Sequence, residues 1–342
     1  MSSPVATVGI LSIGEMGMGI AKLLIAHNFR VVTNVEGRSE DTRIRAQNAG
    51  VEIVPDDTSL VAESDYILSI VPPRDAFYIA TRISAAFNAR SPPKATPLYY
   101  LDLNAISPSS ARSIAELFTT KSPSIKFLDG GIIGGAPHPK PEASSAPPNT
   151  TTVSSHPPTT STWQKPSIPI CGDISSVPAS FSNLSETLGL NHISDEIGIA
   201  SGLKCCFASL AKGFTALCIQ SFTTASNLGV LPLLLGELEQ RMPGMMKSAG
   251  GVTGMPPKAY RWVREMEEIS QTHAEEGGFP SSSSKTPSTG GIFTEIASLY
   301  KVVAEDTILG EEKTERRKRG RTIEDVAAAM GEGLAAKRKK KE

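Results

Sequence analysis

Residues 7–24, TVGILSIGEMGMGIAKLL, decide the fold. An apolar run of strand length leads into a turn that contains Gly14 and Gly17, and an apolar helical pattern follows at once. The spacing matches the G-x-G-x-x-G fingerprint of a phosphate-binding strand–turn–helix unit, except that Ser12 occupies the first glycine position. We expect Gly14 to admit a pyrophosphate, Gly17 to let the helix pack closely, and Ser12 to make the turn without a positive φ. The stretch therefore predicts a dinucleotide-binding unit.

Short apolar runs alternate with helical patterns through residue 135, as in SDYILSIVPP (64–73) followed by RDAFYIATRISAAFN (74–88). This alternation is typical of a parallel sheet that helices cover on both faces. From residue 195 the pattern is helical only, and 195–229 predicts one helix of about 30 residues with an apolar period near 3.6. The sequence thus predicts an α/β fold: an N-terminal domain with a mostly parallel sheet, then an all-α C-terminal domain that begins with a long helix suited to packing between two domains or two subunits.

Composition divides the chain further. Residues 137–167 are rich in Pro, Ser and Thr and nearly devoid of aliphatic side chains, which is typical of a disordered insertion. A shorter Ser/Pro-rich segment, 277–291, predicts a flexible loop. Because SIPICGD (167–173) resumes strand character, the insertion interrupts the first domain. We therefore expect an NAD(P)-binding domain at 1–194, a helical substrate-binding and dimerisation domain at 195–310, and a charged, partly disordered tail at 311–342.

Composition also argues against several classes of protein. A net charge of −1 speaks against a nucleic-acid partner, because neutralising phosphates requires many cations. No apolar run approaches the roughly 20 residues of a membrane span, and the N-terminus lacks the order of a signal peptide. We therefore expect no membrane partner and a cytoplasmic protein. The basic runs KTERRKRGR (313–321) and AAKRKKKE (335–342) leave nuclear import as the alternative to a solvated, disordered end.

The stretch VVTNVEGRSEDTRIR (31–45) should contact the adenosine ribose of the dinucleotide. Glu36 lies about 20 residues past the glycine turn, where a carboxylate accepts hydrogen bonds from the ribose hydroxyls of NAD. Arg38, Ser39 and Arg43 crowd the same place and suit the 2′-phosphate of NADP. The arginines favour NADP, and NAD stays open. The predicted cofactor residues in these two stretches are Ser12, Ile13, Gly14, Glu15, Met16, Gly17, Glu36, Arg38, Ser39 and Arg43.

Five motifs occur in a fixed order: VGILSIGEMGMGIAKLL, SIVPP, LDLNAISP, FLDGGIIGG and GIASGLKCCFASLAKG. Their order resembles the superfamily of 3-hydroxyacid dehydrogenases and 6-phosphogluconate dehydrogenases. GRSEDTRIRAQNAGV and SGLKCCFASLAKGFTALC are similar to its branch with a distinct phosphogluconate-dehydrogenase-type C-terminal domain of uncharacterised function. The resemblance covers most of the chain outside the two Ser/Pro-rich loops and the basic tail. It implies a Rossmann domain and a 6-phosphogluconate dehydrogenase C-terminal-like domain in an NAD(P)-dependent dehydrogenase.

The resemblance also implies roles for single residues. Val71 and Pro72 would line the cofactor groove, and Asn104 would lie near the nicotinamide ribose. Lys204, six residues after Gly198, matches the catalytic lysine of the family. Small and apolar neighbours would partly remove its ammonium from water, as suits a general acid or base. The segment that would approach the substrate through its backbone comprises Asp129, Gly130, Gly131, Ile133, Gly134 and Gly135.

Two departures from the family pattern concern the substrate. Ile133 replaces a serine of the glycine motif, and Ala208 replaces an asparagine one turn after the lysine, although Ser209 is adjacent. A carboxylate without those donors would bind weakly, because its desolvation would go uncompensated. The departures put a standard small 3-hydroxy acid and 6-phosphogluconate in doubt.

Lys212, eight residues after Lys204, is either a second cation for an acidic substrate or a surface residue. The same choice applies to Arg261 and Arg264, which share one helix face at i, i+3 spacing. We expect an oxidoreductase that transfers hydride between NAD(P) and the hydroxyl or carbonyl carbon of a small, acidic metabolite, with Lys204 as general acid or base. The alternatives are a catalytically inactive NADP-binding sensor or scaffold and an imine-reducing enzyme of the same fold. The long apolar helix also predicts a homodimer through the helical domain.

Overall fold

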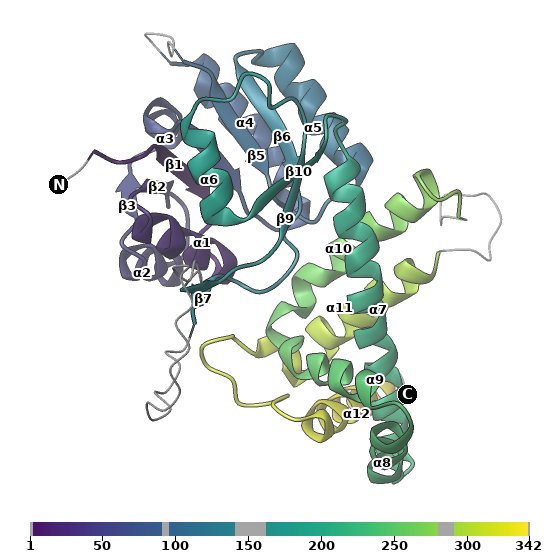
Figure 1. Cartoon of the computed structure of the whole chain (residues 1–342). Coiled ribbons are helices and arrows are strands. Elements are labelled where there is room, and N and C mark those ends of the chain that lie inside the picture. Colours follow the sequence, from purple (N-terminus) through teal and green to yellow (C-terminus); the bar gives the residue numbers. More distant parts are fainter. Residues whose placement is uncertain (1–2, 91–95, 141–161, 280–290, 341–342) are drawn as a thin grey trace, which may run out of the picture. The chain divides into compact units, whose positions relative to one another are not determined.

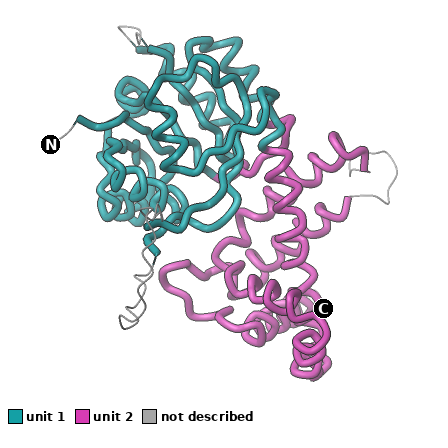
Figure 2. The backbone as a smooth tube through the Cα atoms, in the orientation of Figure 1, with its two compact units in different colours: residues 1–71, 75–104, 111–200 teal, residues 72–74, 105–110, 201–342 magenta. Residues whose placement is uncertain are grey.

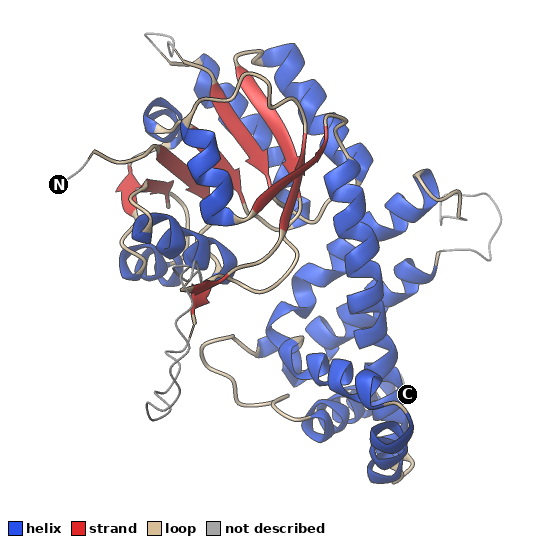
Figure 3. Ribbon diagram, viewed as in Figure 1, coloured by secondary structure: helices blue, strands red, loops and turns tan. Residues whose placement is uncertain are grey.

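A computed structural model describes residues 3–90, 96–140, 162–279 and 291–340 (Figure 1). The chain forms two compact units (Figure 2). The first comprises residues 1–71, 75–104 and 111–200, and the second comprises residues 72–74, 105–110 and 201–342. The first unit carries the sheet, and the second is built of helices (Figure 3).

Eight strands of the first unit form one sheet in the order β10-β9-β6-β5-β4-β1-β2-β3. Their bounds are β1 Thr7–Leu11, β2 Arg30–Asn34, β3 Glu52–Val54, β4 Tyr66–Ser69, β5 Leu98–Asp102, β6 Ile125–Gly130, β9 Ile168–Cys171 and β10 Leu190–Ser194. All neighbours pair in parallel except β6 and β9, so the prediction of a mostly parallel sheet is confirmed. The strand order reverses at β1, and dinucleotides bind beyond the carboxyl ends of the strands at such a reversal.

Helices cover the sheet because its central strands are apolar on both faces. Every residue of β4 and β5 is buried, which explains why these strands read as continuous apolar runs. Ile20 and Leu24 are completely buried on the sheet side of α1, and each contributes roughly 1.5–3 kcal/mol through burial. The helices are α1 Glu15–Ala26, α2 Glu40–Asn48, α3 Asp57–Glu63, α4 Ala76–Asn88, α5 Pro108–Lys121 and α6 Ser180–Leu188, with a 3-10 turn at Pro73–Asp75.

The two ends of the expected insertion at 137–167 are ordered. Strand β7 (His138–Pro139) pairs antiparallel with β8 (Trp163–Gln164), and Trp163 packs against the core of the first unit. This finding corrects the predicted bounds of the insertion, because the backbones of its two ends pair with each other and Trp163 packs on the core. Residues 141–161, and 280–290 of the expected flexible loop, lie outside the described residues.

The predicted long helix is α7 (Ile199–Asn227), which has 29 residues. It shares the core of the second unit with the next helices, through buried side chains such as Ile219, Met266 and Tyr300. The other elements of this unit are α8 Leu231–Arg241, α9 Pro243–Ala249, α10 Ala259–Glu275, α11 Ile292–Asp306 and α12 Ile323–Lys339, with 3-10 turns at Gly250–Gly254, Pro256–Lys258 and Ile308–Glu311.

Helix α7 is long and apolar enough to cross a membrane by length and composition, contrary to the expectation that no segment reaches this limit. The core helix of a globular domain passes the same test, and Ile219 and Phe222 of α7 are buried in the core of the second unit. Another side of α7 is exposed, with Leu210 78% accessible.

The basic C-terminal segment is folded, which corrects the expectation of a partly disordered tail at 311–342. The guanidinium of Arg317 donates to the backbone carbonyls of Thr253 and Arg319, and Arg319 pairs with Asp325 at 2.7 Å. Helix α12 then buries apolar side chains, among them Met330, in the core of the second unit. The arginines hold this segment in place because carbonyl and carboxylate oxygens of the same unit accept hydrogen bonds from their guanidinium groups. Residues 341–342 lie outside the described residues.

Candidate dinucleotide site and lysine centre

The glycine turn after β1 is closed by an unusual backbone conformation. Ser12 has a φ of +75°, which corrects the expectation that serine would make this turn without a positive φ. The left-handed region costs a residue with a Cβ roughly 1–2 kcal/mol. A Cβ on Gly17 would lie 2.3 Å from the carbonyl oxygen of Ser12, so only glycine fits where α1 passes the turn. The turn is therefore strained at one residue and tightly packed at another.

The N-terminus of α1 lies open directly after this turn. Gly14 is its N-cap residue and provides no side-chain hydrogen bond to the first amides of the helix. A Cβ built on Gly14 would meet no atom within 4 Å, so there is room in front of these amides. The N–H groups at the start of a helix and the positive end of its dipole suit a phosphate. The predicted residues 12–17 thus come together as a cradle whose shape and polarity fit a pyrophosphate.

The predicted ribose-binding residues follow β2 on the surface. The strand ends at Asn34, whose side-chain oxygen accepts the amide hydrogen of Glu36 at 2.8 Å. Glu36, Arg38 and Arg43 are exposed, and Ser39 is the N-cap residue of α2. The strand therefore ends in an amide side chain, and the carboxylate of Glu36 lies two residues beyond it.

Arg45 joins α2 to the glycine turn, a role that the sequence patterns did not single out. Its Nε donates to the carbonyl oxygen of Ile13 at 2.8 Å, and its Nη2 donates to Thr42 Oγ1 at 3.1 Å. The guanidinium thus brings a fixed positive charge to the edge of the phosphate cradle. In the sequence, the only indication of this role was that Arg45 is a third arginine in the stretch that contains Arg38 and Arg43.

Asn104 ties together the ends of two central strands. Its Oδ1 accepts the amide hydrogen of Val71 at 2.7 Å, and its Nδ2 donates to Ser69 Oγ and Asp102 Oδ2, both at 2.9 Å. The residue is buried, so its amide group is occupied within the first unit. Asn104 and Val71 therefore shape the carboxyl edge of the sheet, whereas Pro72 belongs to the second unit.

The predicted substrate segment uses several backbone groups internally. Gly131 donates its amide hydrogen to the carbonyl of Pro169 at 3.1 Å, and Ile133 donates to Ser167 at 2.8 Å. Gly134 has a φ of +130° and is exposed, as is Gly135. The amides of Gly131 and Ile133 are therefore engaged in pairing, and the last two glycines form the exposed part of the motif.

Asp129 holds the start of α7, although the resemblance placed it beside the substrate. Its buried Oδ2 accepts the amide hydrogen of Gly198 at 3.1 Å and the thiol of Cys171 at 3.2 Å. The Sγ of Cys171 lies 3.4 Å from the amide nitrogen of Ala200, which donates to it. Burial, reinforced by the charge of Asp129, raises the pKa of Cys171 to about 11, so this thiol stays protonated at neutral pH.

A pocket of about 750 Å³ lies in the first unit, beside the glycine turn. Glu15 and Lys22 of α1 line it together with residues 133–139 and 163–166. Four predicted site residues meet there, namely Glu15, Ile133, Gly134 and Gly135. Much of the wall comes from the ordered ends of the expected insertion. The pocket could not be predicted from composition, because composition assigned these residues to a disordered segment.

Lys204 and Lys212 of α7 have different surroundings in the second unit. Lys204 is half-buried, and no residue in the described ranges gives it a hydrogen bond or ion pair. Lys212 forms an ion pair with Glu265 of α10, and its Nζ lies 4.9 Å from the centroid of the Trp262 ring. Lys212 is therefore an internal cation and not a surface residue. Sequence patterns missed Glu265, whose signal was a carboxylate on the apolar face of α10.

The charged groups around Lys212 and Glu265 shift one another's pKa values. Burial lowers the pKa of Lys212 to about 8, against the opposing charge of Glu265 and with the added charges of Lys204 and Arg261. Burial alone would raise the pKa of Glu265, but the positive charges of Lys212, Lys204 and Arg261 outweigh it and lower that pKa. The pair is therefore ionised near neutral pH.

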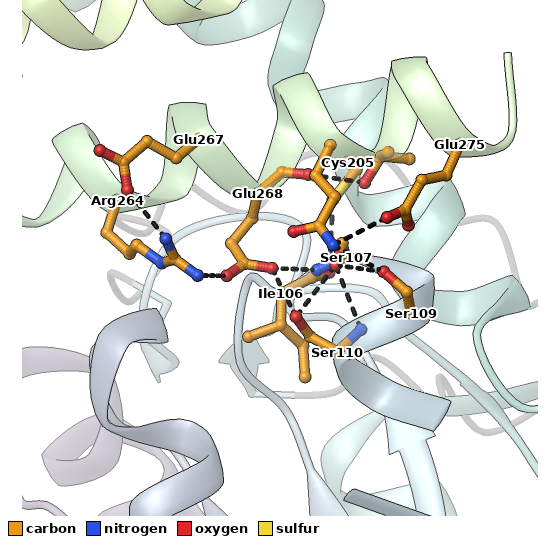
Figure 4. Close-up of polar contacts among 11 residues, drawn as sticks. Ile106, Ser107, Ser109, Ser110, Cys205, Arg264, Glu267, Glu268 and Glu275 are labelled. Carbon is orange, nitrogen blue, oxygen red and sulfur yellow. Dashed lines mark hydrogen bonds and ion pairs between the residues drawn. The ribbon is translucent and has the colours of Figure 1, made fainter. Parts of the chain in front are cut away.

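Glu268, one turn after Glu265, anchors residues 105–110 (Figure 4). Its Oε2 accepts the amide hydrogen of Ser107 and the hydroxyl of Ser110, both at 2.8 Å. Its Oε1 lies 2.6 Å from Nη2 of Arg264, which also pairs with Glu267 at 3.0 Å. Two carboxylates thus satisfy Arg264.

Arg261, by contrast, is half-buried and makes no hydrogen bond or ion pair within the part of the chain that the structure describes. Arg261 and Arg264 therefore have different surroundings, although their spacing in the sequence did not distinguish them. Of the remaining predicted residues, Ser209 is buried and donates its hydroxyl to the carbonyl of Cys206 at 2.7 Å inside α7. The hydrogen of that hydroxyl is thus used by the helix itself.

Two family models match separate parts of the chain. Residues 7–91 match the family described as NADP oxidoreductase coenzyme F420-dependent. Residues 225–303 match a Domain of unknown function (DUF1932). The first match includes the glycine turn, and the second includes Arg261, Glu265 and most of the helices after α7.

Known proteins resemble the chain over most of its length. A 3-hydroxyisobutyrate dehydrogenase from Mycobacterium tuberculosis superposes with a TM-score of 0.56 at 17% identity, covering 88% of this chain and 94% of that one. A conserved protein of unknown function with structural similarity to 3-hydroxyacid dehydrogenases gives a TM-score of 0.52 at 23% identity, covering 87% and 97%. The chain has a 3-hydroxyacid dehydrogenase-like fold. The predicted resemblance is thereby confirmed for the fold.

This chain of 3-hydroxyacid dehydrogenase-like fold thus resembles an NADP oxidoreductase family in its N-terminal part and a domain of unknown function in its C-terminal part. An uncharacterised 28.5 kDa protein of Methanothermus fervidus is 26% identical over 234 residues, which cover 68% of this chain and 76% of that protein. The fold is thus that of NAD(P)-dependent dehydrogenases, while the relatives with the higher identities have no stated function.

Proposed function

We propose that this protein is an NADP-dependent oxidoreductase that transfers hydride between nicotinamide and the hydroxyl or carbonyl carbon of a small, acidic metabolite. The phosphate cradle carries the proposal. Ser12 accepts a strained backbone conformation, and Gly17 leaves room for the turn to lie against α1. Strain that packing maintains at a turn of this kind is typical of binding sites. The match of residues 7–91 to an NADP oxidoreductase family supports the same assignment.

The residues after β2 support NADP over NAD. Arg38 and Arg43 are exposed there, and Arg45 brings a third guanidinium to the edge of the cradle. Guanidinium groups bind phosphate through paired N–H donors, as the 2′-phosphate of NADP requires. No carboxylate ends the strand, because Asn34 holds that position. Glu36 would have to turn towards the ribose for NAD to be preferred.

Lys204 is proposed as the general acid or base. When bound, the dinucleotide supplies the nicotinamide ring that accepts or donates hydride. In oxidation the amine of Lys204 would take the hydroxyl proton, and in reduction its ammonium would return that proton to the oxygen. Its half-buried position and lack of a partner among the described residues support this role, since no competing carboxylate holds the ammonium.

The experiment separates cofactor binding from turnover. NADPH and NADH are titrated by fluorescence, and the protein is then incubated with NADP⁺ or NADPH and a panel of hydroxy acids, sugar acids, keto acids and cyclic imines. We expect tighter binding of NADPH and turnover of an acidic substrate. Turnover should fall by 10²–10⁴-fold in Lys204→Ala with NADPH affinity retained, whereas Lys301→Ala, which removes an exposed lysine, should behave as wild type. The proposal is overturned if neither NADPH nor NADH binds.

A catalytically inactive NADP sensor is the second candidate. Ile133 and Ala208 favour it, because both are apolar where the family has substrate donors, and the amide of Ile133 is already engaged with Ser167. Tight NADPH binding with no turnover across the whole panel would favour the sensor. Turnover of a cyclic imine alone would favour the imine-reducing alternative.

We also propose a homodimer through the second unit. Leu203, Leu210 and Leu217 of α7 are exposed at seven-residue spacing and form one apolar row. Beside this row, a groove of about 510 Å³ is lined mainly by apolar side chains of α7 and α11, among them Phe214 and Phe293. An exposed apolar stripe beside an apolar groove is typical of a protein–protein contact.

A further inference from the structure

Residues 105–110 belong to the helical unit, although they follow directly on Asn104 of the first unit. We call them the serine segment. Two residues of chain span at most roughly 7 Å, so Ile106 cannot move far from Asn104. The resemblance to the superfamily implies that Asn104 lies near the nicotinamide ribose. Whatever holds the serine segment therefore also restrains the chain beside the proposed cofactor site.

Helix α7 holds the serine segment through Cys205. Its thiol donates to the carbonyl oxygen of Ile106 at 3.3 Å, and the residue is only 2% exposed. Burial raises the pKa of Cys205 to about 12, so the sulfur keeps its hydrogen and remains a donor at neutral pH. Cys205 directly follows Lys204, and successive side chains of a helix are about 100° apart around its axis. The bond to Ile106 therefore restrains how α7 is turned at Lys204.

Helix α10 holds the same segment through two side chains (Figure 4). Oε2 of Glu268 accepts hydrogen bonds from the amide of Ser107 and the hydroxyl of Ser110, both at 2.8 Å. Nε2 of Gln271 donates to Ser109 Oγ at 3.1 Å. Glu268 is buried, and hydrogen bonds to a carboxylate are stronger than those between neutral groups. Glu268 is therefore the main anchor of the segment on α10.

These contacts do more than begin helix α5. The segment supplies its own cap, because Oγ of Ser107 accepts the amide hydrogen of Ser110 at 3.2 Å. The bonds from Cys205 and Glu268 come instead from two other helices of the unit. Their effect is to attach the serine segment to α7 and α10.

We infer that Cys205 and Glu268 are positioning residues for proton transfer by Lys204. They tie the turn of α7 that carries this lysine to the segment that follows Asn104. The inference rests on the proposed oxidoreductase function, and neither side chain needs to touch substrate or cofactor. A misplacement of about 1 Å can cost about 100-fold in rate, so even a small loosening of the segment should lower kcat.

The first measurement needs no turnover. Acetic anhydride modifies lysine amines, and mass spectrometry follows the rate at Lys204 with and without NADPH, with the exposed Lys301 as internal reference. NADPH should slow the modification of Lys204 at least threefold in the wild type. Cys205→Ala removes the donor to Ile106 and should abolish this protection, whereas Cys205→Ser keeps a donor and should restore it. Cys218→Ala is the matched control, because the buried thiol of Cys218 in α7 makes no hydrogen bond within the described part of the chain.

The second measurement uses turnover. Cys205→Ala and Glu268→Ala should each lower kcat roughly 10–100-fold, with the KM for NADPH changed by less than about threefold because the phosphate cradle is untouched. Glu267→Ala removes the other carboxylate that pairs with Arg264, without touching the serine segment, and should keep the wild-type kcat. Glu268→Ala should also lose the protection of Lys204. Circular dichroism below the unfolding transition confirms that each variant is folded.

The outcomes separate this inference from the proposed function. It is overturned if NADPH binds without protecting Lys204 in the wild type, or if protection is equal in Cys205→Ala and Cys218→Ala. A loss that Cys205→Ser does not restore would assign the effect to packing and would overturn it too. Protection without turnover of any substrate would overturn the oxidoreductase and leave the positioning of Lys204 standing. Failure of NADPH to bind would overturn both.

Discussion

Lys212 and Glu265 form an ion pair across two helices of the second unit, with side chains only 16% and 7% exposed. A buried pair contributes little net stability, because desolvation offsets the attraction between the charges. Removal of one member is different, because the other is left charged and alone.

The first prediction concerns the loss of one partner of this pair. Lys212→Met should lower the free energy of unfolding by roughly 3–5 kcal/mol, since Glu265 would remain as an unpaired buried carboxylate. The double variant Lys212→Met/Glu265→Leu should recover most of the loss. Urea unfolding of the wild type, both single variants and the double variant measures this coupling. Additive losses in the double variant would contradict it.

The second prediction is a pH dependence of stability that arises from Lys212. Burial lowers its pKa from 10.5 to about 8 in the folded state, so between these values the unfolded chain binds more protons. The contribution of Lys212 to the free energy of unfolding should therefore rise with pH through this window. Urea unfolding at pH 7.5, 9 and 10 should give a slope with pH that is more positive in the wild type than in Lys212→Met. Parallel slopes would refute the expectation.

The third prediction concerns the strain at Ser12. Ser12→Gly should raise the free energy of unfolding by roughly 0.5–1 kcal/mol, because glycine adopts a φ of +75° without steric cost. The affinity for NADPH should be retained, since the shape of the turn is unchanged. Thermal unfolding and fluorescence titration measure the two effects. A less stable Ser12→Gly would mean that the hydroxyl contributes more than the backbone strain costs.

The fourth prediction concerns Gly17, where a substitution should lower the stability that Ser12→Gly raises. In Gly17→Ala the new Cβ would lie 2.3 Å from the carbonyl oxygen of Ser12, so α1 and the turn must separate. We expect a loss of stability and at least a tenfold loss of NADPH affinity. Gly14→Ala is the comparison, because its Cβ meets no protein atom within 4 Å. It should keep the stability of the wild type while still weakening NADPH binding. Equal behaviour of the two variants would argue against the cradle.

The fifth prediction concerns assembly. Leu210→Glu places a charge in the centre of the exposed apolar row of α7 and should convert the proposed dimer into monomers. Sedimentation equilibrium measures the mass, with Leu228→Glu as the control at an exposed leucine beyond the end of α7. A wild-type protein that is monomeric at micromolar concentration would rule the dimer out.

The sequence predicted the elements whose signal is periodic and local. The parallel strands and α7 follow from apolar runs and a 3.6-residue period, and the glycine turn follows from its spacing. The prediction of a disordered basic tail from composition was wrong. Composition shows the charge of Arg317 and Arg319 but not the carbonyl and carboxylate oxygens that accept their hydrogen bonds. For the same reason it placed Trp163 in a disordered segment, although this side chain packs on a core.

The candidate site was predicted only where its residues are adjacent in sequence. Residues 12–17 could be recognised together, whereas Glu265 lies 53 residues from Lys212 and became its partner only through the packing of α7 on α10. Ser12 shows a different limit. Its identity suggested a relaxed turn, but its backbone has a φ of +75°, a conformation that serine seldom adopts.

The hydrogen bonds from Ser107 and Ser110 to Glu268 limit how this protein can be cut into fragments. Residues 105–110 belong to the helical unit by their contacts, yet in the chain they lie between two stretches of the sheet-bearing unit. A fragment cut after residue 200 would carry this segment away from its carboxylate partner and would remove the thiol of Cys205, which donates to the carbonyl of Ile106 at 3.3 Å. The two units are therefore not interchangeable modules, and neither a truncation nor a chimera joined at a single point would preserve both.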